Sequence, residues 1–281
     1  MKKGLILEGG AMRGLFTAGI LDVFLENGVV FDGVVGVSAG AAFGANYKSK
    51  QAGRVIRYNT AFARDKRYCS LSSLIKTGDL YNADFCYHEL PEKLDRFDRQ
   101  TFTNDPTDFF VVCTDVMTGK PVYKRLTTLD YDELEWMRAS ASMPLVSRIV
   151  SVGGYRLLDG GISDSIPVEY FERSGYGKNV VVLTRPAGYR KKQNAFLPLL
   201  KLCYRKYPAF YETLKNRYLR YNETLDYIAE REKSGDLFVI RPDKPLAVGK
   251  TEHDPEKMRA AYNVGREKGA NVLSSVAEFL K

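Results

Sequence analysis

The segment from Phe31 to Ala42 constrains the fold of this chain more than any other stretch. Its sequence, FDGVVGVSAGAA, places the pattern G-x-S-x-G between a short apolar run and a string of small residues that can open a helix. A serine in that context sits in a strained strand-to-helix turn, and the flanking glycines, Gly36 and Gly40, let the backbone pass without a clash. The pattern predicts a nucleophilic Ser38 at a helix N-terminus, where backbone N–H groups favour developing negative charge. The alternative is an ordinary tight turn.

The residues before this segment complete a β-α-β unit. Gly4 to Leu7 has the apolar character of a short buried strand, and a glycine-rich loop follows from Glu8 to Gly14. Helical spacing of apolar residues continues to Leu25, and Asn27-Gly28 is a typical helix C-cap. The strand Gly33 to Val37 then leads straight into the serine. This order predicts an α/β fold with a parallel sheet.

Further elements follow along the chain. Apolar runs predict strands near 108–114, 120–125, 146–152, 155–158, 179–184 and 237–241, with helices near 129–140 and 167–175 and a helical pair over 256–280. The run 120–125 is expected to form a hairpin with 108–114. No linker or internal repeat separates these elements.

The segment from 185 to 220 is basic and aromatic. It holds ten Lys or Arg and a single acid, Glu212, within a chain whose formal net charge is +8. The composition favours a packed helical hairpin with a solvated basic side, and the alternative is peripheral contact with an anionic membrane surface. No base-reading motif is present, so we expect no nucleic-acid partner.

Cysteine and histidine usage bears on cofactors and location. Four cysteines show no C-x-x-C spacing, and only two histidines are present, so we expect reduced thiols and neither a metal nor another cofactor. The apolar run near Met1 is too short for a signal peptide, and no stretch approaches the length of a transmembrane helix. The expected location is the cytoplasm, with the inner membrane surface as a peripheral site.

A serine nucleophile needs a base within hydrogen-bond reach. The chain order Ser38, Asp159, His253 matches an α/β-hydrolase triad, but Ser38 follows only two strands, and His253 lies just before a helix N-terminus. His88 is equally isolated. The competing arrangement uses Asp159 itself as the base, because the two glycines after it let the carboxylate approach another segment closely. Its own alternative is an Asp-Gly turn.

The glycine-rich loop from Gly9 to Gly14 favours the second arrangement. It follows the first strand and opens a helix, so its N–H groups can form an anion-binding nest beside Ser38. A dinucleotide fingerprint does not fit, because Ala11 occupies the position of the second glycine.

These motifs, in this order, resemble those of the patatin-like phospholipases, bacterial branch. The shared features are an oxyanion loop ending in Arg13-Gly14, the G-x-S-x-G serine and the D-G-G aspartate at 159–161. The stretches 139–144 and 164–168 are also similar to segments around the family's aspartate. The resemblance covers roughly residues 4–185 as the catalytic domain, and 186–281 is similar to a mainly helical C-terminal extension.

The resemblance implies a three-layer patatin-like fold, with a mostly parallel central sheet flanked by helices and a helical C-terminal extension. It implies a serine acyl hydrolase that cleaves phospholipid or lysophospholipid esters through a Ser-Asp dyad and an acyl-enzyme. The residues carried over are Ser38 as nucleophile, Asp159 as general base, Gly9, Gly10, Ala11, Arg13 and Gly14 around the oxyanion hole, and Gly36, Gly40, Gly160 and Gly161 as support for the elbow and the dyad.

The chain departs from the family pattern at two places. Ala11 stands where a third glycine is common, and its N–H serves the oxyanion only if φ is negative there. Asp164-Ser165 replaces an asparagine pair, which changes the hydrogen bonding near Asp159. Two other functions stay open: a soluble carboxylesterase or thioesterase for small acyl substrates, and a catalytically silent module that binds anionic lipid.

Overall fold

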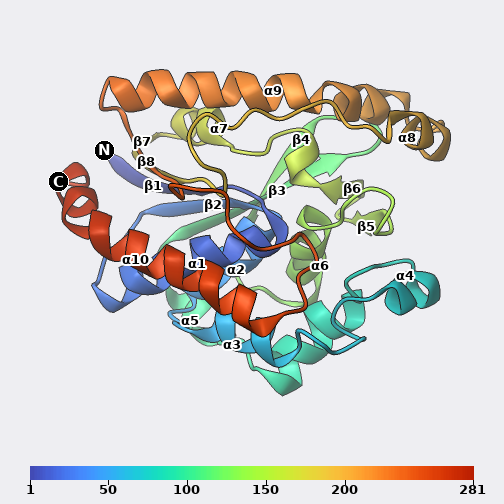
Figure 1. Ribbon diagram of the computed structural model, residues 1–281, viewed down its shortest axis with the longest axis horizontal. Coiled ribbons are helices and arrows are strands. Elements are labelled where there is room, and N and C mark those ends of the chain that lie inside the picture. The colour runs from blue at the N-terminus through green and yellow to red at the C-terminus, as the bar shows by residue number, and fades with distance from the viewer.

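The computed structural model describes residues 1–281 and shows a mixed eight-stranded sheet between two helical layers (Figure 1). The strands run in the order β5-β6-β3-β2-β1-β7-β8, and β4 also pairs with β3. Their bounds are β1 Lys2–Leu7, β2 Gly33–Val37, β3 Asp108–Asp115, β4 Pro121–Leu126, β5 Val150–Val152, β6 Tyr155–Asp159, β7 Tyr176–Val182 and β8 Leu237–Ile240. The strands β1, β2, β3, β7 and β8 run parallel to one another, whereas β4 and β6 run antiparallel to β3, and β5 antiparallel to β6.

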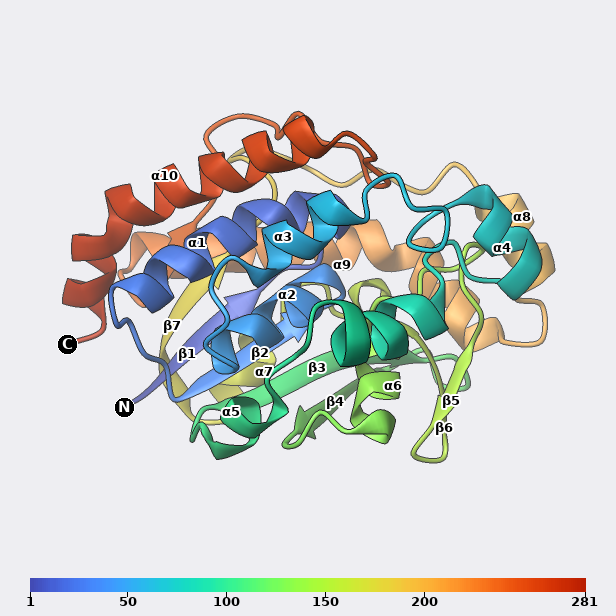
Figure 2. The same ribbon diagram turned by 90° about the horizontal axis from the view of Figure 1, so that it is seen from below.

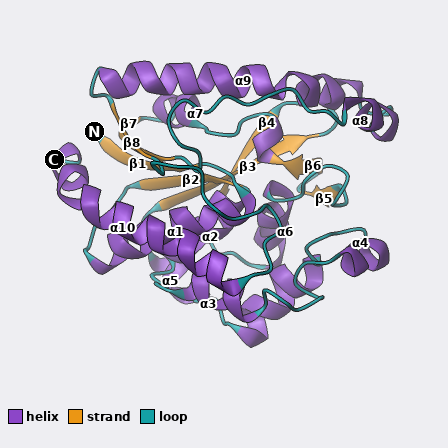
Figure 3. Ribbon diagram, viewed as in Figure 1, coloured by secondary structure: helices purple, strands orange, loops and turns teal.

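Helices cover both faces of the sheet (Figures 1 and 3). The helices α1, α2 and α10 lie on one face, and α7 and α9 lie on the other. Figure 2 shows α10 lying along α1, with α3 beside them. The bounds are η1 Ala11–Arg13, α1 Gly14–Glu26, α2 Ala39–Lys48, α3 Arg54–Ala61, α4 Leu71–Thr77, η2 Asp84–Leu94, α5 Arg99–Asn104, α6 Tyr131–Ser140, η3 Gly160–Ile162, α7 Val168–Arg173, α8 Leu197–Cys203, α9 Pro208–Lys233 and α10 Pro255–Phe279.

The central strands are buried because helices pack on both of their faces. All five residues of β2 are buried, as are the last four of β1. Such strands are continuous apolar runs rather than alternating ones. The predicted α/β architecture, with its mostly parallel sheet flanked by helices and its C-terminal helices, is confirmed.

The C-terminal part is more closely integrated than its helical composition suggests. Its strand β8 extends the central sheet by pairing in parallel with β7. Its helices are α8, α9 and α10, of which α9 continues well beyond the basic segment to Lys233. The domain boundary at residue 185 stays a prediction.

The predicted helical pair over 256–280 is wrong, because α10 is one helix from Pro255 to Phe279. Two of its glycines lie inside the helix and face α1 at close range. A Cβ on Gly265 would lie 2.0 Å from the carbonyl oxygen of Phe16, and one on Gly19 of α1 would lie 2.2 Å from that of Tyr262. These glycines therefore permit a close helix crossing and do not end the helix.

Two boundaries also differ from the predictions. The strand expected over 146–152 is limited to β5, because residues 144–147 form a turn. The helix expected from residue 129 begins at Tyr131, because the Asp130 side chain accepts a hydrogen bond from Glu133 N and caps the helix there.

Candidate active site

The register of four strands brings the predicted site residues to one edge of the sheet. Leu7 of β1 pairs with Gly36 of β2, and Val37 pairs with Val112 of β3. The next residue of β3, Cys113, pairs with Asp159 of β6. Val112 and Cys113 both pair with β4 along the other edge of β3, so β2 and β6 follow one another along the same edge, and Ser38 after β2 lies next to Asp159 at the end of β6.

Ser38 adopts a backbone conformation that L-residues rarely occupy. Its φ is 54° and its ψ is −123°, between the end of β2 and the start of α2. Both flanking glycines are required sterically, because a Cβ on Gly36 would lie 2.5 Å from Ala41 Cα and one on Gly40 would lie 2.5 Å from the Leu7 carbonyl oxygen. This is the geometry expected of a nucleophile elbow, in which the strain presents the hydroxyl.

Ser140 anchors the elbow from the end of α6. The Ser38 backbone N–H donates to Ser140 Oγ at 2.9 Å, and Ser140 Oγ donates to the carbonyl oxygen of Val112 at 2.6 Å. The elbow is thus fastened to β3 through one buried hydroxyl. Sequence analysis noted only the small-residue stretch 139–144 here and assigned Ser140 no role.

Asp159 is held rigidly at the end of β6. Its side chain is buried, and the residue is only 6% exposed. Its Oδ1 accepts a hydrogen bond from Gly161 N at 2.7 Å, and its carbonyl oxygen accepts one from Thr114 Oγ1 at 2.8 Å. The Asp159 backbone N–H donates to the carbonyl oxygen of Ser142 at 2.8 Å.

Burial raises the pKa of Asp159 above the ordinary aspartate value. The guanidinium of Arg217, the Ser38 hydroxyl and the Gly161 N–H favour the carboxylate and oppose part of this rise. A carboxylate with a raised pKa is a stronger base than an exposed one. Because the Asp159 carboxylate interacts with the Ser38 hydroxyl, it is positioned to accept the proton that this hydroxyl releases. The pair can therefore act as nucleophile and base.

The loop after β1 presents free N–H groups beside Ser38. A Cβ on Gly9 would lie 2.9 Å from the Val37 carbonyl oxygen and 3.2 Å from Ser38 Cβ, so the two segments touch. Residues 9–11 donate their backbone N–H groups to no acceptor within the protein. Preorganised donors of this kind stabilise an oxyanion.

Ala11 does not have the negative φ on which its oxyanion role was conditional. Its φ is 49°, the left-handed conformation that a glycine adopts without penalty. The alanine therefore keeps a glycine-like loop geometry at the cost of backbone strain. Its N–H lacks a protein acceptor. The oxyanion role of Ala11 stays a prediction, although the condition of a negative φ is not met.

Arg13 and Glu8 are close in sequence but do not form an ion pair. Glu8 is only 2% exposed, and it accepts hydrogen bonds from Tyr221 OH at 2.6 Å and from Thr184 N at 2.5 Å. The Nε of Arg13 is buried without a hydrogen-bond partner. Burial and neighbouring Arg185 lower the pKa of Arg13.

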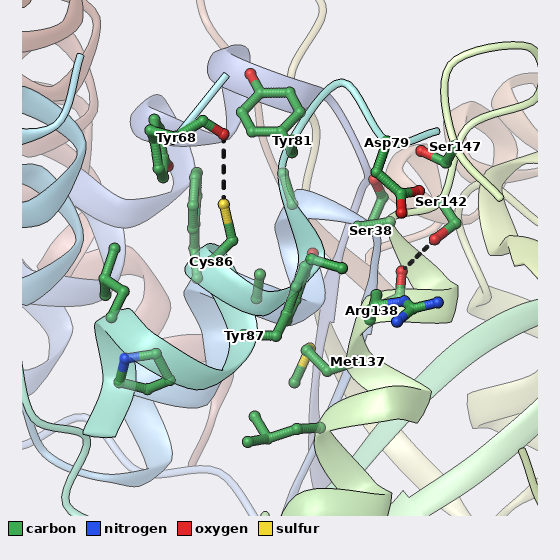
Figure 4. A pocket seen from close by; sticks show the side chains of 18 of the residues that line it. Ser38, Tyr68, Asp79, Tyr81, Cys86, Tyr87, Met137, Arg138, Ser142 and Ser147 are labelled. Atoms are coloured by element: carbon green, nitrogen blue, oxygen red, sulfur yellow. Dashed lines mark hydrogen bonds between the residues drawn. The ribbon is translucent and has the colours of Figure 1, made fainter. Parts of the chain in front are cut away.

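Two pockets of opposite character meet at Ser38. The first is an apolar pocket in which 21 of 28 lining residues are hydrophobic, and Figure 4 shows Ser38, Tyr87 and Met137 around it. The second is a polar cavity of about 530 Å³ in which only 7 of 22 lining residues are hydrophobic. Asp159 and residues 9–11 line the polar cavity. The arrangement fits a molecule that is apolar at one end and polar at the other.

Neither histidine lines these two pockets. His88 Nε2 lies 3.1 Å from Glu135 Oε1, and its ring stacks on Tyr131. His253 Nδ1 lies 2.8 Å from the carbonyl oxygen of Ala63. Both have structural partners away from Ser38.

Asp164 and Ser165, which replace the asparagine pair of the family pattern, are both hydrogen-bonded. Ser165 Oγ donates to the Gly161 carbonyl oxygen at 2.6 Å, and Asp164 Oδ2 accepts from Tyr123 OH at 2.8 Å. Gly160 itself approaches β3 closely, since a Cβ there would lie 2.1 Å from the Val112 carbonyl oxygen.

Comparison with known proteins defines the class. The sequence model of the patatin-like phospholipases matches residues 5–172, and a domain of unknown function, DUF6363, matches residues 207–281. The chain belongs to the patatin-like phospholipase family. No helix in it combines the length and the apolar character needed to cross a membrane.

Individual relatives share limited sequence identity with this chain. The uncharacterized protein YjjU of Escherichia coli is 27% identical, over 98% of this chain and 78% of its own length. The uncharacterized NTE family protein MT2641 of Mycobacterium tuberculosis is 27% identical, over 69% of this chain and 32% of its own length. Among solved structures, VipD from Legionella pneumophila aligns with a TM-score of 0.47 and 13% identity, over 98% of this chain and 67% of its own.

Proposed function

We propose that the protein is a lipid acyl hydrolase in which Ser38 and Asp159 act as a dyad. Asp159 takes the proton as Ser38 Oγ attacks the ester carbonyl carbon, and the carbonyl oxygen becomes the oxyanion. The N–H groups of residues 9–11 stabilise that oxyanion. The C–O bond to the alcohol then breaks, and Asp159 returns the proton to the leaving oxygen. Water, deprotonated by Asp159, releases the acid from the acyl-enzyme in the same way.

The observation that carries this proposal is the place of Ser38 at the junction of the two pockets. The apolar pocket suits an acyl chain, because it removes aliphatic surface from water, and the polar cavity suits the alcohol part of the ester. A relative supports the same chemistry: the lysophospholipase nte1 of Aspergillus fumigatus is 27% identical, over 63% of this chain and 11% of its own length. A phospholipid or lysophospholipid is the substrate class that we favour.

We also propose that the rim of the site contacts a membrane surface from the cytoplasmic side. The short helices α4 and α8 lie at one end of the molecule in both views of the ribbon (Figures 1 and 2). Each carries exposed apolar side chains, among them Ile75 at 85% exposure and Leu202 at 65%. The residues after α4 line the apolar pocket, and Phe196 before α8 lines the polar cavity.

The test is release of free fatty acid from phospholipid, lysophospholipid and short-chain esters in the presence of a chelator. Ser38→Ala and Asp159→Asn are each expected to reduce the rate by at least about a hundredfold, since nucleophile and base act as a unit. His88→Gln and His253→Gln serve as matched controls and keep nearly all activity, because neither histidine lines the site.

A large loss in a folded histidine variant would contradict the dyad and favour the triad. Equal rates on monomeric and aggregated substrate would favour a small-ester hydrolase. Binding of anionic vesicles by the wild type, without turnover of any ester, would favour the silent lipid-binding module.

A further inference from the structure

The polar cavity has a strongly positive lining. Seven Lys or Arg side chains line it, against two carboxylates. They come from segments far apart in the sequence: Arg13 after β1, Arg185, Arg190, Lys191 and Lys192 after β7, Arg217 on α9 and Lys250 before α10. The tertiary fold therefore gathers these charges around a hollow next to Ser38.

The chain provides almost no counter-charge for them. Among the seven, only Arg190 forms an ion pair, with Asp226 outside the cavity. The two carboxylates of the cavity have other roles, since Glu8 is hydrogen-bonded by Tyr221 and Thr184, and Asp159 is the proposed base. Elsewhere in the molecule, exposed arginines and lysines commonly pair with acids, as Arg266 does with Glu26.

Three guanidinium groups of the cavity also lack hydrogen-bond acceptors. The Nε atoms of Arg13, Arg185 and Arg217 are buried without a partner. A buried donor without an acceptor is unfavourable, and three in one cavity indicate that an acceptor is missing. Several N–H donors that converge with positive charge match the oxygen atoms of a phosphate group.

Lys191, one of the three lysines of the cavity, is affected by its burial and by these neighbouring charges. Burial, followed by the neighbouring guanidinium of Arg217, lowers the pKa of Lys191 to about 7. Its backbone is nevertheless fixed, because Lys191 N donates to Asn222 Oδ1 at 2.8 Å and Asn222 Nδ2 donates to the Lys191 carbonyl oxygen at 3.0 Å. The side chain lies over the ring of Tyr221. The amino group is thus held in position before any ligand binds.

From this geometry we infer that the polar cavity binds the phosphate group of the substrate, on an amphipathic ester whose alcohol part ends in a phosphate monoester. The inference rests on the proposed function and names its substrate class. Arg217 brings the positive lining of the cavity next to the proposed base. A Cβ built on Gly161 would lie 3.2 Å from Arg217 Nη2 and 3.0 Å from Asp159 Oδ1, so both groups lie close to Gly161. A phosphocholine headgroup is disfavoured, since its quaternary ammonium adds positive charge to a cavity that already has a surplus.

The test compares three esters with the same acyl chain below their aggregation concentration: a 1-acylglycerol, its 3-phosphate and its 3-phosphocholine. The wild type is expected to favour the phosphate over the neutral ester by about tenfold or more in kcat/KM, the effect of one hydrogen bond to a charged group. The double variant Arg185→Gln with Lys191→Gln removes most of that ratio. Lys201→Gln on α8 is the matched control, because Lys201 is exposed and outside the cavity, and it keeps the ratio.

A second arm separates a lipid headgroup from free phosphate. Inorganic phosphate is added as a competitor during hydrolysis of the neutral ester. Competitive inhibition that is weakened in the double variant, together with the headgroup preference, supports the inference. Inhibition by inorganic phosphate without a preference for the phosphate ester overturns the headgroup assignment and identifies the cavity as a site for free phosphate.

Two other results distinguish failure of this inference from failure of the proposed function. Equal kcat/KM for the neutral ester and the phosphate, without inhibition by inorganic phosphate, overturns the phosphate site and leaves the hydrolase intact. Absence of hydrolysis of every ester by folded wild type overturns the proposed function and, with it, the substrate class.

Discussion

At the scale of single residues, two of the five non-glycine residues with positive φ lie at the elbow and the loop of the site. Ser38 and Ala11 both have positive φ, and they lie on two segments that touch, the elbow after β2 and the loop after β1. A non-glycine residue held in such a conformation costs on the order of 1–3 kcal/mol of stability. The surrounding contacts hold both residues in these conformations despite the cost. Gly9 brings the loop against Val37, and Ser140 fastens the elbow by a hydrogen bond.

The strain at Ser38 can be measured with a matched pair of inactive variants. Ser38→Gly relieves the positive φ, whereas Ser38→Ala keeps it, so we expect the glycine variant to be more stable by about 1 kcal/mol. At an ordinary position the order is reversed, because glycine loses more backbone entropy on folding. Denaturant unfolding of the two variants gives the difference, and a more stable alanine variant would show that the elbow is unstrained.

The ionisation of Asp159 predicts the acid limb of the pH profile. Burial raises the pKa of Asp159, and Arg217 partly lowers it, so removal of Arg217 leaves the pKa higher. The carboxylate must be ionised to accept the serine proton, so activity rises with pH. In Arg217→Gln the acid limb of kcat/KM on a neutral ester therefore moves to higher pH. The control is Arg220→Gln, at an exposed residue of the same helix, which is expected to keep the acid limb of the wild type. An unshifted acid limb in Arg217→Gln would show that Arg217 does not influence the ionisation of Asp159.

At the scale of elements, the contact between α1 and α10 depends on glycines in both helices. Gly19 and Gly265 each face the backbone of the partner helix at a distance that excludes a Cβ. Gly269 also faces α1, near Ile20. The C-terminal helix α10 therefore packs on α1, the first helix of the α/β unit, which begins directly after the loop that carries residues 9–13.

Gly265→Ala tests this contact. In an isolated helix the change would stabilise by about 1 kcal/mol, because alanine is the better helix former. Here the added Cβ would lie 2.0 Å from the Phe16 carbonyl oxygen, so the helices must separate, and we expect a net loss of about 1–3 kcal/mol. Asn263→Ala, at an exposed position of α10, gives the propensity gain alone. A stabilised Gly265→Ala would mean that the two helices can move apart freely.

At the scale of the whole molecule, two short helices that carry exposed apolar side chains, α4 and α8, lie next to segments that line the site. Phe196 is 65% exposed next to α8, and Leu71 and Ile75 are exposed on α4. Patches of exposed apolar residues around a pocket mark surfaces that contact a membrane or a partner. Cations of the 185–220 segment, among them Arg185, Lys191 and Arg217, line the polar cavity, so the basic composition is partly explained by the site.

Substitution of this rim tests membrane contact. Leu199→Ser with Leu202→Ser removes exposed apolar surface of α8 without changing a residue that lines the two pockets, so we expect the rate on aggregated lipid to fall by about tenfold and the rate on monomeric ester to change little. Val30→Ser is the control, because Val30 is equally exposed but precedes β2, at the opposite end of that strand from Ser38. Equal losses on monomeric and aggregated ester would place the effect in the site itself.

The sequence by itself determined the α/β class, the β-α-β start and the order of loop, serine and aspartate. These features are encoded locally: an apolar run forms a strand, small residues allow a tight turn, and the motifs follow the strands that carry them. The tertiary structure alone decided that Ser140 anchors the elbow, that Gly265 serves a helix contact and that Arg13, Arg217 and Lys250 surround one cavity. Such relations join residues more than a hundred positions apart, and they exist only after the helices pack on the sheet.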